Sequence, residues 1–505
     1  MTAAVEMRGI TKRFGAVVAN DAVDLEVLPG SIHGVIGENG AGKSTLMSIL
    51  YGFYTADAGE ITMRGGPVAI QNSADAIDLG IGMVHQHFML VPNFTVLENV
   101  MLGAEGGAML KAGLAENRAE LMRLAEDYGL EVDADALIQD LPVGVQQRVE
   151  IIKALRRGAR VLILDEPTGV LTPDETEGLF QILRELAAEG VSILLITHKL
   201  QEIMAVTDRV SVMRQGKMVA HRATAETSRE ELAELMVGRK VALTSEPRQV
   251  PRGKPALVAE GIGWRDAQGV ARLSEIKLTL HAGEVLGLAG VSGNGQSELL
   301  NVLSGISSMQ AGSLTLAGHR IDHAHPASPA RMRELGLAHV PEDRHRRGLV
   351  LPFSAAENAI LGYHHGPSSG GGVLLRPQVL QDHCARLMAD FDVRPADPSL
   401  RAAGFSGGNQ QKQVLAREIE VTPKVLLVGQ PTRGVDIGAI EFIHARLEDL
   451  KAEGCAILLV SVELEEIVAL SDRIAVMNAG RIVGVLDREE ADLSRIGLMM
   501  AGVAA

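Results

Sequence analysis

Cysteine is almost missing from this chain of 505 residues, in which Cys384 and Cys455 are the only two. Two cysteines cannot build a disulfide framework, so we expect a protein of the reducing cytoplasm. Aromatic residues make up only 3% of the chain. No apolar run reaches the roughly 18 residues of a membrane-spanning helix, and the charged start MTAAVEMRGITKRF lacks the apolar stretch of a signal peptide. The sequence therefore predicts that any membrane role depends on a partner.

Positive charge is also in short supply. The chain has 48 Lys and Arg against 63 Asp and Glu, and this net charge of −15 argues against nucleic acid as a partner. What is present is an ordinary globular composition, with 46% hydrophobic residues. A chain of this length fits two domains of roughly 200 to 250 residues each.

An internal repeat organises the whole chain. The two halves match in the same order, in the pairs GSIHGVIGENGAGKST (30–45) and GEVLGLAGVSGNGQSE (283–298), PNFTVLENVMLG (92–103) and LPFSAAENAILG (351–362), VGVQQRVEIIKAL (143–155) and GGNQQKQVLAREI (407–419), and VLILDEPTGVLTP (161–173) and VLLVGQPTRGVDI (425–437). Such matching predicts two homologous domains. We place them at 1–240 and 256–503, joined by a linker at 241–255 that holds three prolines.

Apolar runs alternate with helical patterns in both halves. VLILD (161–165) and SILLIT (192–197) have the pattern of buried strands, whereas ETEGLFQILRELAAEG (175–190) has that of a helix. This alternation is typical of an α/β fold with a mostly parallel sheet.

A glycine-rich loop in the first half has the spacing of a phosphate-binding P-loop, between a strand pattern (32–36) and a helical pattern (45–52). In such loops the glycines let backbone N–H groups surround phosphate oxygens, the lysine neutralises the terminal phosphates and the serine offers an oxygen to Mg²⁺. The alternative is a glycine-rich turn without a ligand, which the flanking strand and helix disfavour. The predicted nucleotide-binding residues are Gly37, Glu38, Asn39, Gly40, Ala41, Gly42, Lys43, Ser44 and Thr45.

Two acids follow the strand pattern VLIL, and they suit the same chemistry. Asp165 is the predicted magnesium ligand, and Glu166 is the predicted base toward the attacking water. Three further candidates each have a simpler alternative. Gln86 contacts the metal and a partner, or is a surface amide; His198 grips the γ-phosphate, or is an imidazole at the edge of the core. Phe14 stacks on adenine, or is an ordinary core aromatic.

The motifs together resemble a known family. GENGAGKST (37–45), VHQHF (84–88), VGVQQR (143–148), LILDEP (162–167) and ITH (196–198) resemble the ATP-binding cassette of ABC transporters. The duplicated chain resembles, over nearly its whole length, the tandem ATPase subunit of bacterial importers for simple sugars and nucleosides. GNGQSEL (293–299) and GQPTRGVDIGA (429–439) look most like the nucleoside branch.

This resemblance implies an α/β class fold of two tandem P-loop domains. Each has an α/β core, an antiparallel β portion and a helical subdomain, which we expect at 88–158 and 344–421. ATP and Mg²⁺ are the implied ligands and ATP hydrolysis the implied reaction. Glu166, His198 and Gln86 take the catalytic roles, and Ser44, Gln86 and Asp165 are the metal-binding side chains.

The second half departs from the motifs at the catalytic positions. Lys43, Gln86, Asp165, Glu166 and His198 are matched there by Gln296, Glu342, Gly429, Gln430 and Val462. Each lost electrostatic contact costs roughly 3 to 4 kcal/mol of transition-state stabilisation. We therefore expect the second half to lack useful turnover of its own.

The family also has a signature motif at the start of a later helix, and here it is the first half that departs from the family pattern. The second half has FSGGNQQ (405–411), whereas the first has LPVGVQQ (141–147), with Pro142 in place of a serine. Cassettes of the family pair head to tail, so the resemblance implies one competent ATP site that combines the first P-loop with the second signature. Its predicted nucleotide-binding residues on the signature side are Ser406, Gly407, Gly408 and Asn409.

The expected partners follow from the resemblance. Membrane permease subunits should offer short cytoplasmic helices to the grooves beside Gln86 and Glu342, and a solute-binding lipoprotein acts indirectly. The chain is then peripheral on the cytoplasmic face of the cell membrane. The alternative is a soluble tandem-cassette ATPase that acts on ribosomes, for which a long charged linker and two complete sites would be expected. A DNA-repair ATPase would need a coiled coil or zinc cysteines.

Overall fold

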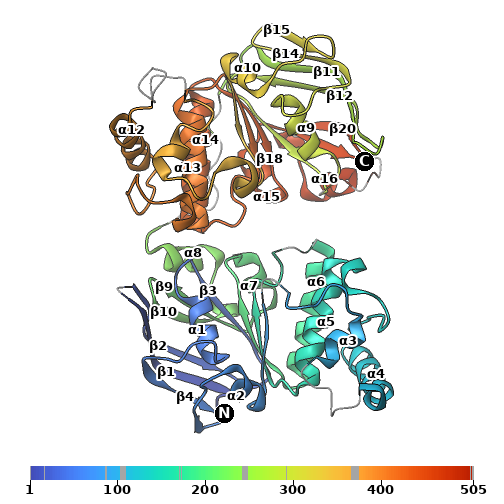
Figure 1. Cartoon of the computed structure of the whole chain (residues 1–505), viewed down its shortest axis with the longest axis vertical. Helices are drawn as coiled ribbons and strands as arrows, with labels where there is room; N and C mark the ends of the chain where they lie inside the picture. The colour runs from blue at the N-terminus through green and yellow to red at the C-terminus, as the bar shows by residue number, and fades with distance from the viewer. Residues whose placement is uncertain are drawn as a thin grey trace. The chain divides into compact units, whose positions relative to one another are not determined.

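The computed structural model describes residues 2–15, 17–85, 88–102, 110–169, 171, 173–240, 248, 250–291, 293–364, 375–500 and 502. The chain divides into two compact units, Met1–Val241 and Ala242–Ala505. Figure 1 shows that each unit contains its own sheets and its own group of helices.

The first unit holds two sheets. An antiparallel sheet in the order β2-β1-β4-β5 consists of β1 (Val5–Phe14), β2 (Val17–Val27), β4 (Ala58–Met63) and β5 (Gly66–Val68). A second sheet in the order β10-β9-β3-β8-β7-β6 consists of β3 (Ile32–Gly37), β6 (Ile81–Val84), β7 (Val161–Asp165), β8 (Ser192–Ile196), β9 (Arg209–Arg214) and β10 (Lys217–Ala223). All neighbours in this sheet are parallel except the antiparallel pair β9 and β10.

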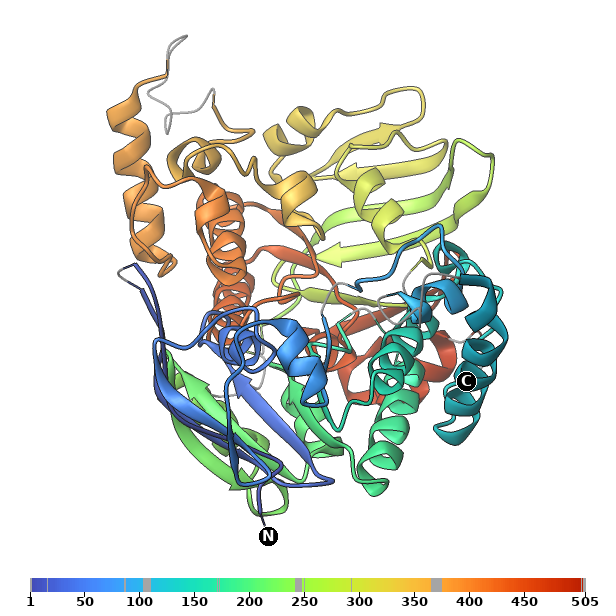
Figure 2. The same ribbon diagram turned by 60° about the horizontal axis from the view of Figure 1, so that its bottom comes forward.

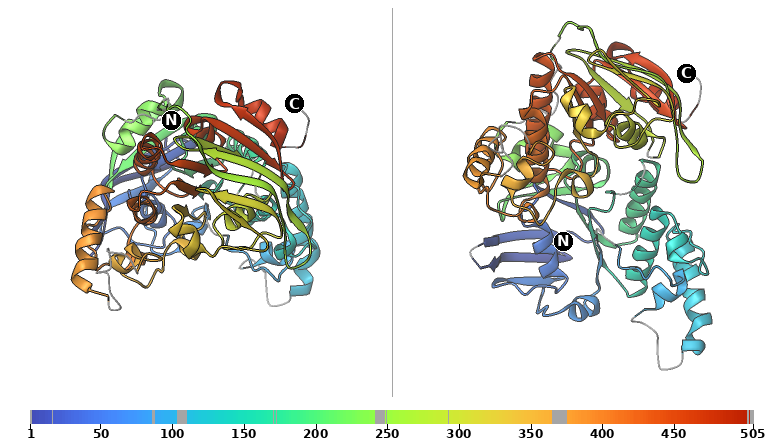
Figure 3. Two further views of the ribbon diagram at one scale, coloured as in Figure 1. Left: turned by 90° about the horizontal axis from the view of Figure 1, so that it is seen from above. Right: turned by 45° about the horizontal axis from the view of Figure 1, so that its top comes forward.

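Three of the helices of the first unit, α3, α4 and α5, form a separate group. The first unit contains α1 (Lys43–Leu50), α2 (Ser73–Asp78), α3 (Val96–Met101), α4 (Leu110–Asp127), α5 (Val143–Arg156), α6 (Pro173–Ala188), α7 (Leu200–Val206) and α8 (Arg229–Val237). Helices α3, α4 and α5 form a group beside the strands (Figures 1 and 3), within the expected window 88–158.

The second unit repeats the plan. Its antiparallel sheet, β12-β11-β14-β15, consists of β11 (Pro255–Arg265), β12 (Ala271–His281), β14 (Ala311–Leu316) and β15 (His319–Asp322). Its larger sheet, β16-β17-β18-β13-β19-β20, consists of β13 (Val285–Ala289), β16 (Leu337–Val340), β17 (Val425–Gly429), β18 (Ala456–Val460), β19 (Arg473–Asn478) and β20 (Arg481–Asp487).

In the second unit, α12, α13 and α14 lie together to one side of the strands (Figures 1 and 2). The α-helices are α9 (Gln296–Leu303), α10 (Pro329–Glu334), α11 (Ala355–Ala359), α12 (Pro377–Asp390), α13 (Gly407–Glu420), α14 (Ile437–Ala452), α15 (Leu464–Leu470) and α16 (Leu493–Met500). The run Arg344–Gly348 forms a π-helical turn.

The strands of the larger sheet are continuous apolar runs because both of their faces are buried. In β7, Leu162 and Leu164 face a core shared with the helical group, whereas Val161 and Ile163 face a core shared with α1 and the antiparallel sheet. A strand buried on both faces has no position for a polar residue until its carboxyl end. Asp165 is the last residue of β7 and stands at that end.

A buried asparagine secures the junction between strands and helices in each unit. The amide of Asn99 accepts a hydrogen bond from the Val91 N–H (2.7 Å) and donates to the Val91 oxygen (3.1 Å). Asn358 repeats this exchange with Val350, at 2.8 and 3.1 Å. We call these two arrangements the asparagine clamps.

The structure confirms the α/β class and the two tandem domains, each with an antiparallel β portion and a helical subdomain. In the part of the chain that the structure describes, no helix has the length and apolar character needed to cross a membrane.

Candidate functional site

The P-loop of the first unit joins the buried strand β3 to helix α1. Gly42 caps the helix with a φ of 100°, and a Cβ there would lie 2.3 Å from the Ala19 backbone oxygen, so only glycine fits. Gly40 has a φ of 82°, and a Cβ on it would meet nothing within 4 Å. The loop thus turns glycine backbone toward open space in front of a helix N-terminus, an arrangement suited to phosphate.

Lys43 is folded onto this loop. It is 5% exposed, and its ammonium donates to the backbone oxygens of Gly37 (2.7 Å) and Glu38 (3.0 Å). The ammonium is a mobile point charge on a flexible stem, so these carbonyl contacts can be exchanged for phosphate oxygens. The structure therefore places the predicted P-loop residues in one loop, while their contact with nucleotide remains a prediction.

Asp165 lies near the hydroxyl of Ser44. Burial, followed by the charge of Glu166, raises the pKa of Asp165, whereas a hydrogen bond with Ser44 and the charge of Lys43 lower it. A hydroxyl and a carboxylate in contact fit Mg²⁺, which takes oxygen ligands and usually keeps waters and substrate phosphates besides one or two carboxylates. Among the described residues, no three His, Cys, Asp or Glu side chains gather as a metal site.

Glu166 has an unusual backbone. Its φ is 48°, a left-handed value uncommon for residues with a side chain, and its N–H donates to the Ile196 oxygen at 2.8 Å. His198 Nδ1 lies 2.9 Å from Glu166 Oε1, and this hydrogen bond holds the pKa of Glu166 below its ordinary value. The carboxylate is therefore ionised at neutral pH and able to accept a proton from water.

Two other predicted residues have different outcomes. Phe14 is 43% exposed, so it is not a core aromatic; its ring stands edge-on to Tyr54 with centroids 5.1 Å apart. The Lys12 ammonium lies over the Phe14 ring, 5.7 Å from its centroid, so a stacked base would have to displace it; the stacking remains a prediction. Gln86 lies outside the described residues.

The signature segments differ at their helix starts. Helix α13 begins after the exposed Ser406, whose hydroxyl oxygen accepts hydrogen bonds from the Asn409 N–H (3.5 Å) and Nδ2 (2.9 Å). A Cβ on Gly407 would lie 2.7 Å from Arg344 Nη2, so the start of the helix is closely packed. Helix α5 begins after Pro142, which provides no side-chain cap. Only the second of these helix starts has a hydroxyl and a glycine pair to present to an anion.

The second unit keeps the shape of the P-loop without its charge. Gly293 and Gly295 have φ values of 89° and 107°, close to those of Gly40 and Gly42. The buried side chain of Gln296 donates from Nε2 to the Val291 oxygen at 3.1 Å, as Lys43 does to the first loop.

Gln430 repeats the backbone of Glu166. Its φ is 50°, and its N–H donates to the Val460 oxygen at 2.7 Å. Gln430 Oε1 accepts from the Val462 N–H at 3.2 Å, on the side where Glu166 meets His198 in the first unit. The geometry is retained, but an amide cannot serve as a general base.

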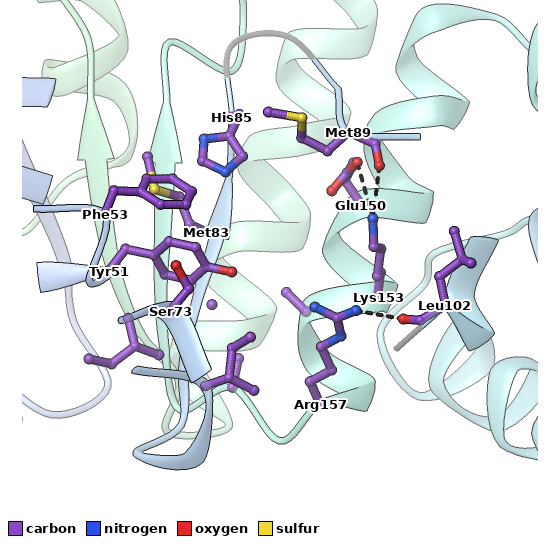
Figure 4. Close-up of a pocket in the computed structure, with 15 residues that line it drawn as sticks. Tyr51, Phe53, Ser73, Met83, His85, Met89, Leu102, Glu150, Lys153 and Arg157 are labelled. Carbon is purple, nitrogen blue, oxygen red and sulfur yellow. Dashed lines mark hydrogen bonds and ion pairs between the residues drawn. The ribbon is translucent and has the colours of Figure 1, made fainter. Parts of the chain in front are cut away.

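A pocket of about 470 Å³ opens in the first unit between the core and the helical group. Tyr51, Phe53 and His85 line one side, and Met89 extends from the other (Figure 4). Phe53 and His85 stack with centroids 5.5 Å apart. The pocket is thus mainly apolar and aromatic, in a chain that has few aromatic residues.

Charged groups stand across the pocket from these rings. Lys153 Nζ lies 3.8 Å from Glu150 Oε1 and donates to the Met89 oxygen at 3.0 Å. Arg157 donates from Nη2 to the Leu102 oxygen at 2.6 Å, while its buried Nε has no partner among the described residues (Figure 4). An unpaired guanidinium N–H beside an apolar pocket favours an acidic group on whatever enters it.

The sequence predicts a groove beside Gln86, and Met89 of this pocket follows Gln86 closely in the chain, but the aromatic and charged residues that line the pocket were not predicted. The run YGFY (51–54) after α1 was the available signal, because clustered aromatics are rare in this chain. Glu342, which we expect beside a groove for a partner helix, accepts a hydrogen bond from Ser297. That neighbour lies 45 residues away and no pattern pointed to it.

Curated proteins of similar sequence span the whole chain. The chain is 45% identical over 498 residues to "Nucleoside import ATP-binding protein NupA" of Lactococcus lactis, covering 99% of this chain and 98% of that protein. It is 46% identical to "Guanosine import ATP-binding protein NupO" of Bacillus subtilis, with 99% and 97% covered. It is 41% identical to "Ribose import ATP-binding protein RbsA 1" of Rubrobacter xylanophilus, with 99% of each covered.

Solved structures agree on the fold alone. The "RNase-L Inhibitor" structure has a TM-score of 0.66 at 19% identity and covers 98% of this chain and 93% of its own. The structure of an archaeal ribosome recycling factor in complex with a ribosomal stalk protein has a TM-score of 0.65, also at 19% identity, and covers 97% of this chain and 92% of its own.

The sequence profile of the ABC transporter family matches residues 20–169 and 273–433, one match in each unit. The chain is a tandem ATPase that belongs to the ABC transporter family.

Proposed function

We propose that this chain hydrolyses ATP to energise a membrane importer of nucleosides or simple sugars. The observation that carries the proposal is the grouping of Lys43, Asp165 and Glu166 in the first unit, in a chain similar over its full length to import ATP-binding proteins. The ribosome-acting alternative is supported only by fold likeness at 19% identity.

The first unit's residues divide the work of hydrolysis. The P-loop N–H groups and Lys43 hold the phosphates, and Glu166 accepts the proton of the attacking water. His198 leaves Glu166 to donate to the γ-phosphate, which frees the carboxylate for its role. Ser44 and Asp165 would hold Mg²⁺, which when bound neutralises charge that develops on the phosphates.

We further propose that one composite site does the work. Ser406, with Gly407 and Gly408 at the start of α13, completes the site by offering a hydroxyl, N–H groups and a helix N-terminus to the γ-phosphate. Asn409, which bonds to Ser406, orients that hydroxyl. Phe14, supported by Tyr54, takes the adenine.

The partner we propose is a permease subunit on the cytoplasmic face of the membrane. Its short amphipathic helix enters the pocket with an apolar face against Phe53 and Met89 and an acidic side chain toward Arg157. A solute-binding lipoprotein delivers the solute to the permease. Relatives named for nucleosides, guanosine and ribose support both solute classes.

The test is reconstitution with the permease subunits in proteoliposomes. ATP-dependent uptake of labelled nucleoside or simple sugar is the expected result, and ATP hydrolysis without uptake of either would contradict the importer role. Arg157→Glu should lower complex yield and uptake but keep the ATP hydrolysis of the isolated chain. Arg148→Glu is the matched control, because Arg148 lies in α5, the helix that Arg157 caps, but outside the pocket.

A further inference from the structure

Glu202 is a buried carboxylate to which the proposed mechanism gives no role. It lies in the first turn of α7 and is 5% exposed, so its charge needs partners inside the protein. Thr168 donates a hydrogen bond from Oγ1 to Glu202 Oε1, and Thr197 donates from Oγ1 to Glu202 Oε2 at 2.9 Å. The ammonium of Lys199 lies 3.4 Å from Oε1. Both oxygens of the carboxylate are therefore bonded.

The two threonines belong to the two segments that carry the proposed base and its histidine partner. Thr168 follows Glu166 by two residues, after β7, and Thr197 comes directly before His198, after β8. Thr168 and Thr197 are 3% and 2% exposed, so water has little access to either bond. Glu202 thus joins the segment after one strand to the segment after its neighbour. We call Glu202 with its two threonines the glutamate clasp.

The clasp acts beyond the point where the sheet pairs the two strands. The last paired residues of β7 and β8 are Asp165 and Ile196. His198 meets Glu166 after that point, with Nδ1 2.9 Å from Oε1. Hydrogen bonds to an ionised group are roughly twice as strong as neutral ones. The two bonds of the clasp are therefore well suited to fix the segments after the strands end.

The second unit has a glutamate at the same position, but it bonds differently. Glu466, the counterpart of Glu202, has its Oε1 3.0 Å from His444 Nε2, and its buried Oε2 has no partner among the described residues. His444 stands in α14 at the position that Phe180 takes in α6, so the first unit has no imidazole there to compete for the carboxylate. Among the described residues, the clasp is formed only in the unit that keeps the proposed base and its histidine.

We propose that Glu202 is a positioning residue for ATP hydrolysis, because the clasp holds Glu166 and His198 at the spacing that proton transfer needs. A general base must stay within hydrogen-bond reach of the proton that it accepts. A misplacement of about 1 Å caused by a change away from the chemistry can cost about 10²-fold in rate. Glu202 takes no part in the chemistry itself, since both of its oxygens are bonded within the protein. This inference rests on the proposed hydrolytic function of the first unit.

The test is ATP hydrolysis by the full-length chain with Glu202→Gln, which keeps the size of the side chain but turns one of its two acceptors into a donor. We expect kcat to fall roughly 10- to 100-fold. The KM for ATP should hardly change, because the P-loop is not part of the clasp. Equilibrium dialysis with labelled ATP counts the binding-competent chains, so that a loss of folded protein is not taken for a loss of kcat. Glu466→Gln, the same change in the second unit, is the matched control and should alter neither constant.

Thr197 offers a milder pair of variants, which decides the matter if Glu202→Gln does not fold. Thr197→Val removes the hydroxyl and should lower kcat, whereas Thr197→Ser keeps it and should retain the rate. Serine already stands at the matching position, Ser461. In a His198→Ala background, Glu202→Gln should slow single-turnover hydrolysis much less than it does in the unaltered chain, because the contact that the clasp fixes is gone.

The outcomes separate this inference from the proposed function. An unchanged kcat in Glu202→Gln, equal rates in Thr197→Val and Thr197→Ser, or the same loss with and without His198 overturns the positioning role and leaves the first unit's function intact. A Glu166→Gln protein that retains its activity overturns the proposed hydrolytic site itself.

Discussion

Replacing Glu166 by glutamine is the sharpest perturbation of the proposed mechanism, because the fold already carries glutamine at the matching position. Gln430 has a φ of 50° against 48° for Glu166, and the backbone bonds from their N–H groups measure 2.7 and 2.8 Å. Glu166→Gln should therefore cost little stability and leave the phosphate cradle in place.

The expected loss is catalytic. General base catalysis contributes about 10²- to 10⁴-fold, which corresponds to roughly 2.7 to 5.4 kcal/mol at 1.36 kcal/mol per tenfold. Phosphate release by the full chain should fall by that factor, while labelled ATP stays bound after gel filtration. Gln430→Ala is the matched control and should change the rate less than about twofold if its unit has no turnover. A Glu166→Gln protein that keeps more than a tenth of its activity, or a Gln430→Ala protein slowed equally, would refute the assignment.

Three other predictions test the remaining parts of the site. Ser406→Arg should reduce hydrolysis about as strongly as Lys43→Ala, whereas Pro142→Arg should cost far less; steady-state ATPase rates decide this, and equal losses at 406 and 142 would contradict a single competent site. The isolated first unit, residues 1–240, should bind ATP but hydrolyse it poorly because it lacks the Ser406 signature, and rates matching the full chain would count against the composite site. Asp165→Asn should stabilise the nucleotide-free protein by about 0.5 to 2 kcal/mol at pH 7, because the raised pKa of Asp165 means that its ionised form opposes folding above that pKa. The gain should vanish as the pH falls and Asp165 is protonated, so thermal melts that differ equally at pH 4 and pH 7 would show that burial of the charge is not the cause.

Much of the site was predictable because most of its residues lie in short, contiguous sequence motifs. The P-loop from Gly37 to Thr45 and the strand ending at Asp165 could be placed from apolar patterns and glycine spacing alone. Comparing the two halves then identified each replaced residue by register, as in Gln430 for Glu166. These features are local, so the sequence contains the information that places them.

The unpredicted features depend on contacts between distant segments. Ser297 and Glu342 are 45 residues apart, and only folding shows that Glu342 fills the space beside Gly429. The pocket could not be predicted because it forms only when folding brings Tyr51, at the end of α1, close to Arg157, at the end of α5. The contact between His198 and Glu166 likewise follows from the adjacency of β7 and β8, not from any spacing along the chain.

The asparagine clamps have a mechanical consequence. Asn99 is fully buried, and its amide bonds to both polar groups of Val91 and also donates to the Thr95 oxygen at 3.0 Å. Opening a clamp breaks three hydrogen bonds at roughly 0.5 to 1.5 kcal/mol each, which is well above thermal energy. The segment from Val91 to Asn99 should therefore move as one piece with the start of α3 instead of bending locally. Because Asn358 makes the same bonds to Val350 in the second unit, the segment from Val350 to Asn358 should be stiff in the same way, although the two units differ in their P-loop residues.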